Sequence, residues 1–557
     1  MGHFHGTQHA SAELKLKLNM SRKANQNGRK GRELPLDSGQ YPGACGTTIE
    51  TVSIMTEVAD VIVIGAGIGG LTTAALLQER GVSVVVFEKN AFPGGSCSAF
   101  RKAGYTFDAG ASVFYGFSDD DRRGTLNLHS RIFRRLGVEL RTIPDPVQIH
   151  YHMPKGFEVP VHYDRTRFLE CLYRRFPHER DGIRRFYDEL ESVYDILNAL
   201  PAGSLEDVVH LGAVGVQNPL KTMSLGFKTL FSMGGVARRF IHDKELLRFI
   251  DLESYAWALQ DADSTPLVNA GICLADRHHG GINYPVGGSG AIADALVRGV
   301  EKFGGTVRYK SEVEEILIEE GRATGVRLRG GEEVRARAVV SNATVWDTFN
   351  RLIPDPRYRV AEDRFIKSPS WFQLYLGVHA AVIPADFNVH HVLVDDWSSY
   401  DSNGGTIYFS APSVLDPTLA PEGRHTVHVF VTAETSEWDK YERNTPEYRL
   451  AKEEYGRSII ARTERILPGL QSAVELMITA TPRTHERYLS RWDGSYGPLL
   501  KPGQNVLRKP QNRTPVRDLF AAGDSTFPGQ GVIAVTYSGV SCASYIARQL
   551  GKPLEYL

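Results

Sequence analysis

Cysteine is scarce in this chain of 557 residues: there are five cysteines, and no two of them form a C-x-x-C pair. This pattern excludes a disulfide scaffold and a cysteine-ligated zinc site, and it predicts reduced thiols in a reducing compartment. Neither sign of charge is in excess, because 64 lysines and arginines stand against 65 acids and leave a net charge of -1. The bulk charge therefore gives no reason to expect nucleic acid as a partner.

Long apolar runs are also missing. The strongest candidate, residues 58–77, contains four glycines and Asp60, so a strand followed by an amphipathic helix explains it better than a membrane span does. With 42% hydrophobic residues the chain has the composition of a packed globular protein, and its length exceeds that of a usual single domain. We therefore expect two domains with substantial cores.

Residues 1–57 differ in composition from the rest of the chain. Lysine and arginine outnumber the acids there, and no apolar stretch is long enough for a secretory signal. We expect this segment to be disordered, and three interpretations stay open: a transit peptide, a nonspecific basic tail or expression leader, and a start-site artefact, since Met55 directly precedes the first predicted strand. Gly2 does not begin a myristoylation signal, because Gly6 stands where that signal needs Ser or Thr.

A strand, a glycine cluster, a helix and a second strand are predicted in immediate succession. Val61–Ile64 is a short β-branched run typical of a buried parallel strand, and it ends at the glycines. Leu71–Arg80 consists of good helix formers and is followed by Gly81, a residue type favoured just after a helix. Val82–Phe87 is again apolar and leads to Glu88. This order predicts a βαβ unit.

The spacing inside this unit is that of a dinucleotide site. Gly65 permits the tight turn, Gly67 lets the backbone approach a pyrophosphate, and Gly70 lets the helix pack closely on the strand. The phosphates then lie at the positive end of the helix, where exposed N–H groups favour an anion. Glu88 is placed to accept hydrogen bonds from ribose hydroxyls, which favours an unphosphorylated ribose. Because all four features agree, we predict dinucleotide binding rather than a purely structural unit.

A glycine loop, an arginine and an acid follow the βαβ unit. The loop is at 93–95, the arginine is Arg101, and the acid opens a D-x-G segment within 108–112. Together with the glycine fingerprint, this order resembles the flavin amine oxidase and phytoene desaturase type of flavoprotein. The resemblance implies that Lys89, Gly95, Arg101 and residues 108–112 lie along the flavin.

A second cofactor motif is predicted near the C-terminal end. The segment LFAAGDSTFPGQG begins as a strand, passes Gly523 and Asp524, and continues from about Gly531 as a long helix. In the resembling flavoproteins the acid binds ribitol or pyrophosphate groups, and the helix directs its N-terminus at the flavin N1 and O2 edge, where a positive dipole stabilises the reduced flavin. The family also holds the adenine by the backbone of the strand that begins here at Val313. Two separated cofactor motifs imply FAD rather than NAD.

Two further sequence segments point to one subgroup of this type of flavoprotein. Residues 276–290, with YPVGG at 284–288, and SNATVWDTF at 341–349 are similar to the plant and cyanobacterial carotenoid isomerases, also called prolycopene isomerases. The likeness covers residues 58–550. It implies redox-neutral cis to trans isomerisation of a poly-cis carotene such as prolycopene, with reduced FAD lowering the order of a double bond whose uncatalysed rotation is prohibitively slow.

Other functions stay open on the same skeleton. A desaturase, a retinol-saturase-like reductase or a xanthophyll-modifying enzyme would change the conjugation or the hydration of its product. A carrier without flavin is a third alternative, because the Rab GDP-dissociation inhibitors share a related fold. The intact glycines of both cofactor motifs and Glu88 oppose that alternative.

The implied fold class is α/β: a discontinuous FAD-binding Rossmann domain of the glutathione reductase type, with an inserted α+β substrate domain. We expect the first domain to comprise residues 58–145, 276–350 and 510–550. The second, with a helical cap, is expected to comprise 146–275 and 351–509.

An apolar cavity above the flavin is implied by the same resemblance. Its wall is expected to come from aromatic residues on predicted strands, although aromatic residues in strands are more often ordinary core. Residues 220–241 combine apolar and basic residues, and they form either an internal helical cap or a membrane-surface entrance for a lipid substrate. The aromatic candidates are Trp371, Tyr375 and Tyr408, followed by Phe372, Trp397 and Phe409.

No catalytic residue is assigned. No serine, cysteine or paired-carboxylate constellation stands out, so the flavin itself is expected to carry the difficult step. Glu486 and Asp276 are weak candidates for an acid. Thr484, His485 and Arg487 lie in a segment that resembles the isomerases and desaturases, and they either serve the flavin region or tie that segment to the dinucleotide domain.

Several histidines invite a metal hypothesis that we do not adopt. His150, His152 and His162 lie on a hairpin predicted within residues 145–168, but nothing in the sequence supplies outer-shell partners. His390 and His391 would point to opposite faces of a strand, so joint ligation is not expected. We therefore predict no metal.

Localisation and partners follow from the resemblance. A carotenoid isomerase of a photosynthetic eukaryote belongs in the plastid, in the stroma or at a thylakoid or envelope surface, because its substrate resides in membranes. A cyanobacterial protein would be cytoplasmic and peripheral to the membrane. The expected partners are a long polyene, a membrane surface and an electron donor of unknown identity.

Overall fold

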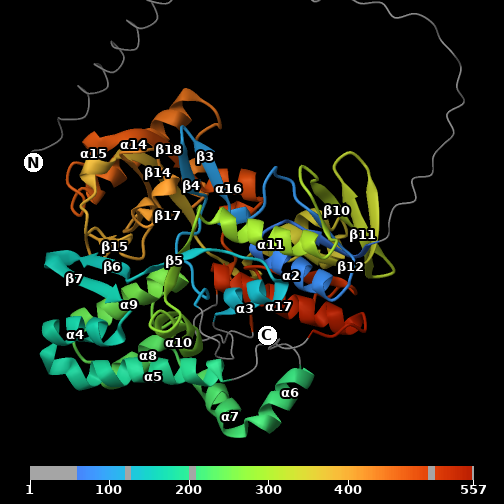
Figure 1. The fold of residues 1–557 in the computed structure, drawn as a ribbon, viewed down its shortest axis with the longest axis horizontal. Coiled ribbons are helices and arrows are strands. Elements are labelled where there is room, and N and C mark those ends of the chain that lie inside the picture. Colours follow the sequence, from blue (N-terminus) through green and yellow to red (C-terminus); the bar gives the residue numbers. More distant parts are fainter. Residues whose placement is uncertain (1–58, 119–126, 200–207, 500–507, 555–557) are drawn as a thin grey trace, which may run out of the picture. The chain divides into compact units, whose positions relative to one another are not determined.

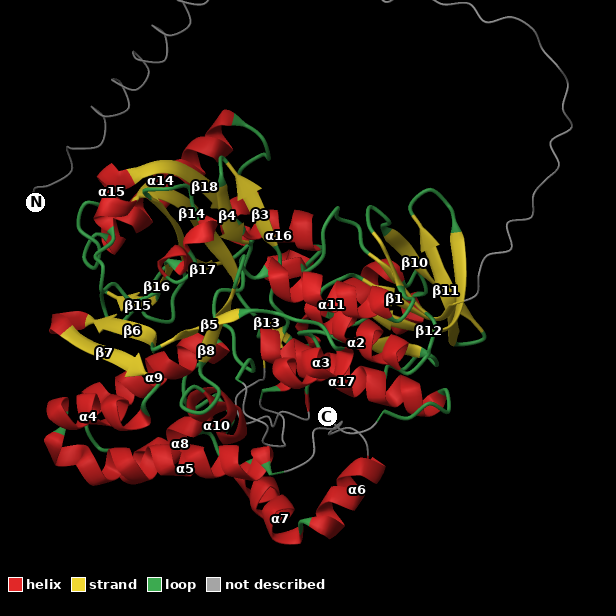
Figure 2. Cartoon of the chain, in the orientation of Figure 1, coloured by secondary structure: helices red, strands yellow, loops and turns green. Residues whose placement is uncertain are grey.

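Two seven-stranded sheets organise the part of the chain that the computed structural model describes (Figure 1 and Figure 2). The leader predicted for residues 1–57 lies outside it, as does Cys45. The other four cysteines carry free thiols, in agreement with the predicted reduced state. The described residues are 59–118, 127–199, 208–499 and 508–554.

The first sheet contains the predicted βαβ unit. Five parallel strands lie in the order β20-β12-β1-β2-β9, and the antiparallel strands β11 and β10 follow from β12. β12 belongs to both parts of the sheet, because its first residues pair with β11 and its last residues pair with β1 and β20. The strands are β1 (Ala59–Ile64), β2 (Val84–Phe87), β9 (Thr306–Arg308), β10 (Val313–Glu319), β11 (Arg322–Leu328), β12 (Glu333–Ser341) and β20 (Leu519–Ala521).

Helices cover the central parallel strands. They are α2 (Ile68–Glu79), α3 (Leu128–Leu136), α11 (Gly290–Lys302) and α17 (Val532–Gln549) (Figure 1). Helices α2 and α17 cross closely because glycines meet there: a Cβ on Gly539 would lie only 2.6 Å from the carbonyl oxygen of Gly69. The βαβ unit and the C-terminal helix are therefore packed directly together, although about 450 residues separate them in the sequence.

The second sheet has the order β18-β14-β17-β16-β15-β6-β7, and all its pairs except β15 with β6 are antiparallel. The hairpin predicted within 145–168 is β6 and β7. One face of this sheet packs on α14 (Pro446–Thr463) through alternate residues such as Phe372 and Leu374. The strands are β6 (Val147–Met153), β7 (Phe157–His162), β14 (Ser370–His379), β15 (His390–Val394), β16 (Thr406–Ser410), β17 (Arg424–Ala433) and β18 (Val474–Ala480).

A helical region follows β7. Its core packs on the apolar face of the β6–β7 hairpin, whereas α6 and α7 extend away from it at the lower edge of Figure 1. In the part of the chain that is described, no helix is both long and apolar enough to cross a bilayer. The helices are α4 (Arg165–Arg175), α5 (Arg180–Asn198), α6 (Val208–Gln217), α7 (Pro219–Lys228), α8 (Met233–Phe240), α9 (Lys244–Ala258) and α10 (Leu267–Asp276).

Short elements connect these layers. A hairpin is formed by β3 (Ala99–Lys102) and β4 (Tyr105–Asp108). The YPVGG block begins in β8 (Ile282–Pro285), which pairs with β5 (Thr142–Asp145). The segment PRTHERYL forms the helix α16 (Pro482–Leu489). The remaining pieces are α12 (Val345–Asp347), α13 (Ser436–Asp439), α15 (Leu470–Ala473), β13 (Ile366–Lys367) and β19 (Pro498–Leu499).

Candidate functional site

A cavity of about 680 Å³ is lined by residues of both sheets. Its volume is in the range of small-molecule and cofactor sites. It begins beside the ends of β1, β2 and β10, passes the N-termini of α2 and α17, and continues to the face of the second sheet that does not contact α14. The predicted site residues that line it are Gly65, Gly67, Glu88, Lys89, Gly95, Val313, Trp371, Tyr408, Gly523, Asp524 and Gly531.

The N-terminus of α2 is open toward the cavity. Gly67 is the residue before the helix, no side chain caps it, and the first turn contains no acid. Gly65 has a φ of +91°, a conformation that favours glycine, and Gly70 lies directly beneath it. A Cβ on Gly70 would lie 2.5 Å from the carbonyl oxygen of Gly65. The glycines thus leave uncapped backbone N–H groups facing a space that suits a phosphate.

Glu88 is buried at the end of β2 and is fixed by two backbone groups. Its Oε2 accepts a hydrogen bond from the N–H of Ala66 at 2.8 Å, and its Oε1 accepts one from the N–H of Asn90 at 2.8 Å. The carboxylate is therefore held rigidly at the cavity wall near Val313. This is the position expected for an acid that accepts hydrogen bonds from ribose hydroxyls.

Lys89 is tied to the segment that follows α16. Its Nζ donates to the carbonyl oxygen of Arg487 at 2.9 Å and to the hydroxyl of Ser490. Burial lowers the pKa of Lys89, although Glu312 and Glu88 act in the opposite direction. Lys89 thus links the second strand of the βαβ unit to a distant segment while lining the cavity.

The N-terminus of α17 is the second open helix end at the cavity. Gly531 precedes it without a side-chain cap, and its first turn contains no acid. Val532 and Val535 present apolar side chains to the same space. The positive end of the helix dipole therefore faces an otherwise apolar part of the cavity, where it favours negative charge.

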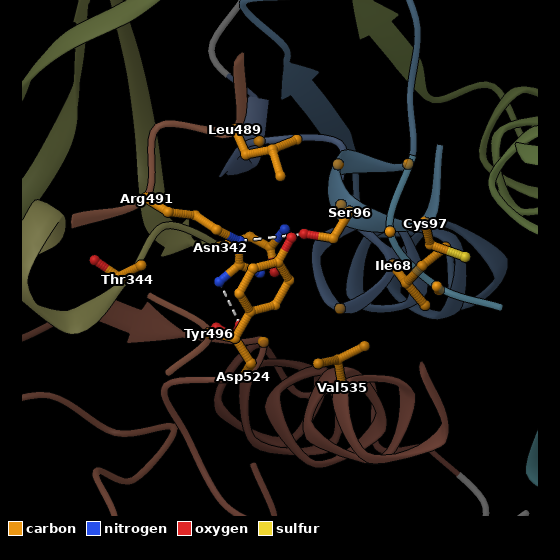
Figure 3. Close-up of a pocket in the computed structure, with 18 of the residues that line it drawn as sticks. Ile68, Ser96, Cys97, Asn342, Thr344, Leu489, Arg491, Tyr496, Asp524 and Val535 are labelled. Atoms are coloured by element: carbon orange, nitrogen blue, oxygen red, sulfur yellow. Dashed lines mark hydrogen bonds and ion pairs between the residues drawn. The ribbon is translucent and has the colours of Figure 1, made fainter. Parts of the chain in front are cut away.

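Asp524 is paired with Arg491, which the sequence did not point to (Figure 3). Arg491 Nη1 lies 2.5 Å from Asp524 Oδ2, and Nε donates to the hydroxyl of Ser96 at 3.2 Å. The guanidinium also lies 4.2 Å from the centre of the Tyr496 ring. Burial acts to lower the pKa of Arg491, but Asp524 raises it, so the cation is stable in the cavity wall.

Tyr496 lies in the middle of the close-up in Figure 3, with its ring beside the guanidinium of Arg491. Its hydroxyl is 3.0 Å from Nδ1 of His485. Burial lowers the pKa of His485 to about 3 and raises the pKa of Tyr496, so both groups are neutral near neutral pH. The Tyr496 hydroxyl and the His485 imidazole are therefore two neutral, titratable groups in contact at this end of the cavity.

The far section of the cavity is lined by an aromatic cluster. Tyr408 on β16 and Phe430 on β17 are register partners whose rings stack at 5.2 Å between centroids. Trp371 on β14 meets both rings edge-on, at 5.5 and 5.3 Å. Trp257, Ile149 and Val392 complete an apolar wall, which suits a long hydrocarbon better than a polar ligand.

Several predicted site residues are placed elsewhere. Arg101 does not lie along the cavity: on β3 it alternates with Phe100, which packs inward on Phe107, so the Arg101 side chain is exposed. Tyr375 is buried against the β3–β4 hairpin, and its hydroxyl donates to the carbonyl oxygen of Ala109 at 2.7 Å. Phe372 and Phe409 belong to the core beneath α14, and Trp397 to the core of the helical region.

The two acid candidates do not line the cavity either. Glu486 pairs with Arg443 at 2.8 Å, and Asp276 is buried at the end of α10. In α16, Thr484 belongs to a capping box and Arg487 is exposed, so of these three candidates only His485 approaches the site, through Tyr496.

The comparisons with known proteins agree with this arrangement. A family model described as flavin containing amine oxidoreductase matches residues 68–547. The chain is 43% identical over 499 residues to a protein of Daucus carota named prolycopene isomerase, chloroplastic. The aligned region covers 88% of this chain and 80% of the carrot protein. It is 27% identical over 550 residues to a neurosporene-forming phytoene desaturase of Cereibacter sphaeroides, with 91% and 99% covered.

A solved structure shows the fold. An oxidoreductase from Methanosarcina mazei superposes with a TM-score of 0.57 at 20% identity, covering 86% of this chain and 99% of that one. The open helix ends, the buried Glu88 and the Arg491–Asp524 pair fit a flavin, the cofactor that gives the family its description. The chain belongs to the flavin-containing amine oxidoreductase family and, within it, to the prolycopene isomerases.

Proposed function

We propose that the protein isomerises poly-cis carotenoids to the all-trans form, converting prolycopene to all-trans-lycopene with FAD in its reduced state and without net oxidation. The observation that carries the proposal is the single cavity that joins a dinucleotide site to an aromatic, apolar section. A soluble polar substrate would not suit the wall formed by Trp371, Tyr408 and Phe430.

Residues that line the cavity would hold each part of FAD. Glu88 and the backbone at Val313 would hold the adenosine, the N-terminus of α2 would bind the pyrophosphate, and Asp524 with the N-terminus of α17 would face the flavin end. Bound there in its reduced state, FAD would lend electron density or a hydride equivalent to a conjugated chain and take it back, which would lower the order of a double bond without net oxidation.

The protein's own residues position the polyene and exclude water. Trp371, Tyr408 and Phe430 form a rigid apolar wall, so the chain enters dehydrated and in a fixed orientation. Where the reaction includes a protonation step, the Tyr496 hydroxyl would give its proton to the polyene and take it back when the double bond forms again, with His485 Nδ1 positioning that hydroxyl at 3.0 Å. Arg491 stabilises negative charge beside the ring of Tyr496.

A phytoene desaturase type of reaction is the second candidate, because that family shares 27% identity with this chain. Product mass separates the two. Incubation of the flavin-loaded protein with poly-cis lycopene in liposomes, followed by chromatography and mass spectrometry, is expected to give all-trans product of unchanged mass. Loss of two hydrogens would replace the isomerase with the second candidate, whereas gain of two hydrogens or of one water would indicate a saturase-like or a xanthophyll-modifying enzyme.

The substrate resides in membranes, and the α6–α7 pair supplies a surface that fits one. Five large apolar side chains on this pair and just after it are between 62% and 83% exposed, and the sequence contains no acid from 208 to 242. On α7, Leu220, Met223 and Phe227 recur at helical spacing on one face. Exposed apolar residues next to basic ones favour an anionic bilayer surface. The five residues are Val216, Leu220, Met223, Phe227 and Leu230.

Replacing Leu220, Met223 and Phe227 together by Gln is expected to weaken binding to anionic liposomes by at least about tenfold, since each buried side chain contributes roughly 1.5–3 kcal/mol. Cosedimentation measures the binding, and flavin content should not change. Leu450→Gln on α14, where the side chain is 56% exposed, is the matched control and should bind as the wild type does. If the triple variant bound liposomes as strongly as the wild type, α6 and α7 would not be the membrane-binding surface.

The relatives named chloroplastic support a plastid location, with the stroma or a thylakoid or envelope surface as the compartment in a photosynthetic eukaryote. We further propose that one domain, residues 58–145, 276–350 and 510–550, binds the cofactor. The other domain, residues 146–275 and 351–509, would hold the substrate.

A further inference from the structure

Three histidines meet on the face of the second sheet that is turned away from the cavity. His150 and His152 lie two residues apart on β6, and His391 on β15 is the register partner of His150. One ring nitrogen from each lies within 4.8 Å of the others. Ile149 and Val392, which alternate with these histidines, line the cavity on the opposite face.

The earlier expectation that no outer shell is present is therefore wrong for these residues. Glu158 on β7 is the register partner of His152, and its Oε1 lies 3.2 Å from His152 Nδ1. The backbone carbonyl of Asn388 lies 2.9 Å from His391 Nε2. His390 is directed to the other face, where it contacts Ser410, and His162 is not a member of the cluster.

The tautomers of two of these rings are set by their partners. A carbonyl oxygen only accepts, so His391 carries its proton on Nε2 and presents a lone pair at Nδ1. A carboxylate likewise only accepts, so His152 carries its proton on Nδ1 and presents a lone pair at Nε2. These two lone-pair nitrogens, His152 Nε2 and His391 Nδ1, lie 2.9 Å apart.

Two facing lone pairs need a cation between them. Neutral imidazoles that donate their other N–H to a carboxylate or a carbonyl are the form in which histidine binds metals. Arg465, the nearby cation, is engaged by the His152 carbonyl and by Asp395.

We propose that His150, His152 and His391 bind a divalent zinc-like ion, with Glu158 and the Asn388 carbonyl orienting two of the rings and water in the fourth position. His150 Nδ1, which lies 3.2 Å from the side-chain amide of Asn388, would exchange that contact for the ion. Ligands on a tetrahedral ion with Zn–N distances of about 2.0–2.1 Å lie roughly 3.3–3.4 Å apart, so the separation of 2.9 Å between His152 Nε2 and His391 Nδ1 would widen by a few tenths of an ångström on binding. The ion would fix β6, β7 and β15 together and thereby hold the cavity wall at Ile149 and Val392. This role is independent of the proposed isomerase function.

The test uses the flavin-loaded protein after treatment with a chelator and dialysis. Zn²⁺ is titrated in competition with a chromophoric chelator, and Co²⁺ is added separately to look for the visible bands of a tetrahedral site by difference spectroscopy. We expect one equivalent of either ion per chain and a higher Tm with Zn²⁺. Failure of the wild type to bind a stoichiometric equivalent overturns the proposal.

Matched variants assign the ligands. His152→Gln and His391→Gln should lose the stoichiometric site, whereas His162→Gln and His390→Gln should keep it, all with unchanged flavin content. If His152→Gln or His391→Gln does not fold, Glu158→Gln tests the site instead, because the Glu158 side chain is 53% exposed and its replacement should leave the fold intact. Outer-shell changes reduce metal affinity by about 10–100-fold, and Glu158→Gln should fall in this range. Binding that is equally strong in all variants contradicts the assignment.

Discussion

A single methyl group on Gly70 is expected to leave the protein unable to retain its flavin. In the Gly70→Ala variant the new Cβ would lie 2.5 Å from the Gly65 carbonyl oxygen and 3.1 Å from a methyl group of Val63. The first of these neighbours is backbone in the glycine turn, so relief requires the N-terminus of α2 to move. Overpacking of this kind costs about 1–3 kcal/mol, which corresponds to a roughly 5–150-fold loss of flavin affinity.

The measurement is the flavin-to-protein ratio from the absorption spectrum, followed by titration of the apoprotein with FAD. Gly226→Ala is the matched control, because Gly226 is also helical and a Cβ there meets nothing within 4 Å. The control should retain flavin as the wild type does. Wild-type affinity in Gly70→Ala would contradict the assignment of the phosphate site to this turn.

Removing the charge of Arg491 is expected to have the second large effect. In Arg491→Met the carboxylate of Asp524 loses its partner at 2.5 Å, while both side chains are at most 15% exposed. Breaking a buried ion pair costs about 3–5 kcal/mol, so we expect a lower free energy of unfolding and weak flavin binding. Isomerase activity should fall as well, because Tyr496 loses the cation over its ring.

Chemical unfolding followed by flavin fluorescence measures both effects. Arg491→Lys should recover part of the loss, since it restores the charge but not the hydrogen bonds to Ser96 and to the Ser495 carbonyl. Arg357→Met is the control: that arginine is 80% exposed beside Asp355, and such a surface pair contributes about 0–1 kcal/mol. An Arg491→Met protein as stable and flavin-rich as the control would show that the pair is not needed.

Most residues predicted for the cofactor half of the site line the cavity, because the signals that pointed to them are local. The glycine turn, Glu88 and the strand–loop–helix at Gly523 to Gly531 each lie within a short segment whose spacing follows from backbone geometry. The resemblance then related the two ends of the chain. Their direct contact through Gly69 and Gly539 required the structure.

The substrate half was harder to predict because it depends on which face of a strand a residue occupies. Trp371 and Tyr408 line the cavity as expected, but Phe430 was not predicted and Tyr375 lies beyond the cavity on the β3–β4 hairpin. Arg101 was placed by motif order alone, and strand alternation turns it outward.

Arg491 and Tyr496 were missed for a different reason. They lie in an irregular segment after α16, and their roles depend on contacts with Ser96 and Asp524 that are distant in sequence. The only local signal was an arginine and a tyrosine five residues apart, just after a segment that already resembled the isomerases. The histidine cluster likewise depends on the register of β6 with β15.

The proposed function requires that reduced flavin in this cavity isomerises a polyene without net electron transfer. Its most direct test is anaerobic incubation of the protein in liposomes with poly-cis lycopene, with the flavin either oxidised or fully reduced beforehand and its absorption spectrum recorded throughout. We expect many turnovers to the all-trans product with reduced flavin only, while the flavin spectrum stays that of the reduced form. Turnover with oxidised flavin, or stoichiometric change of the flavin spectrum with each product formed, would contradict it.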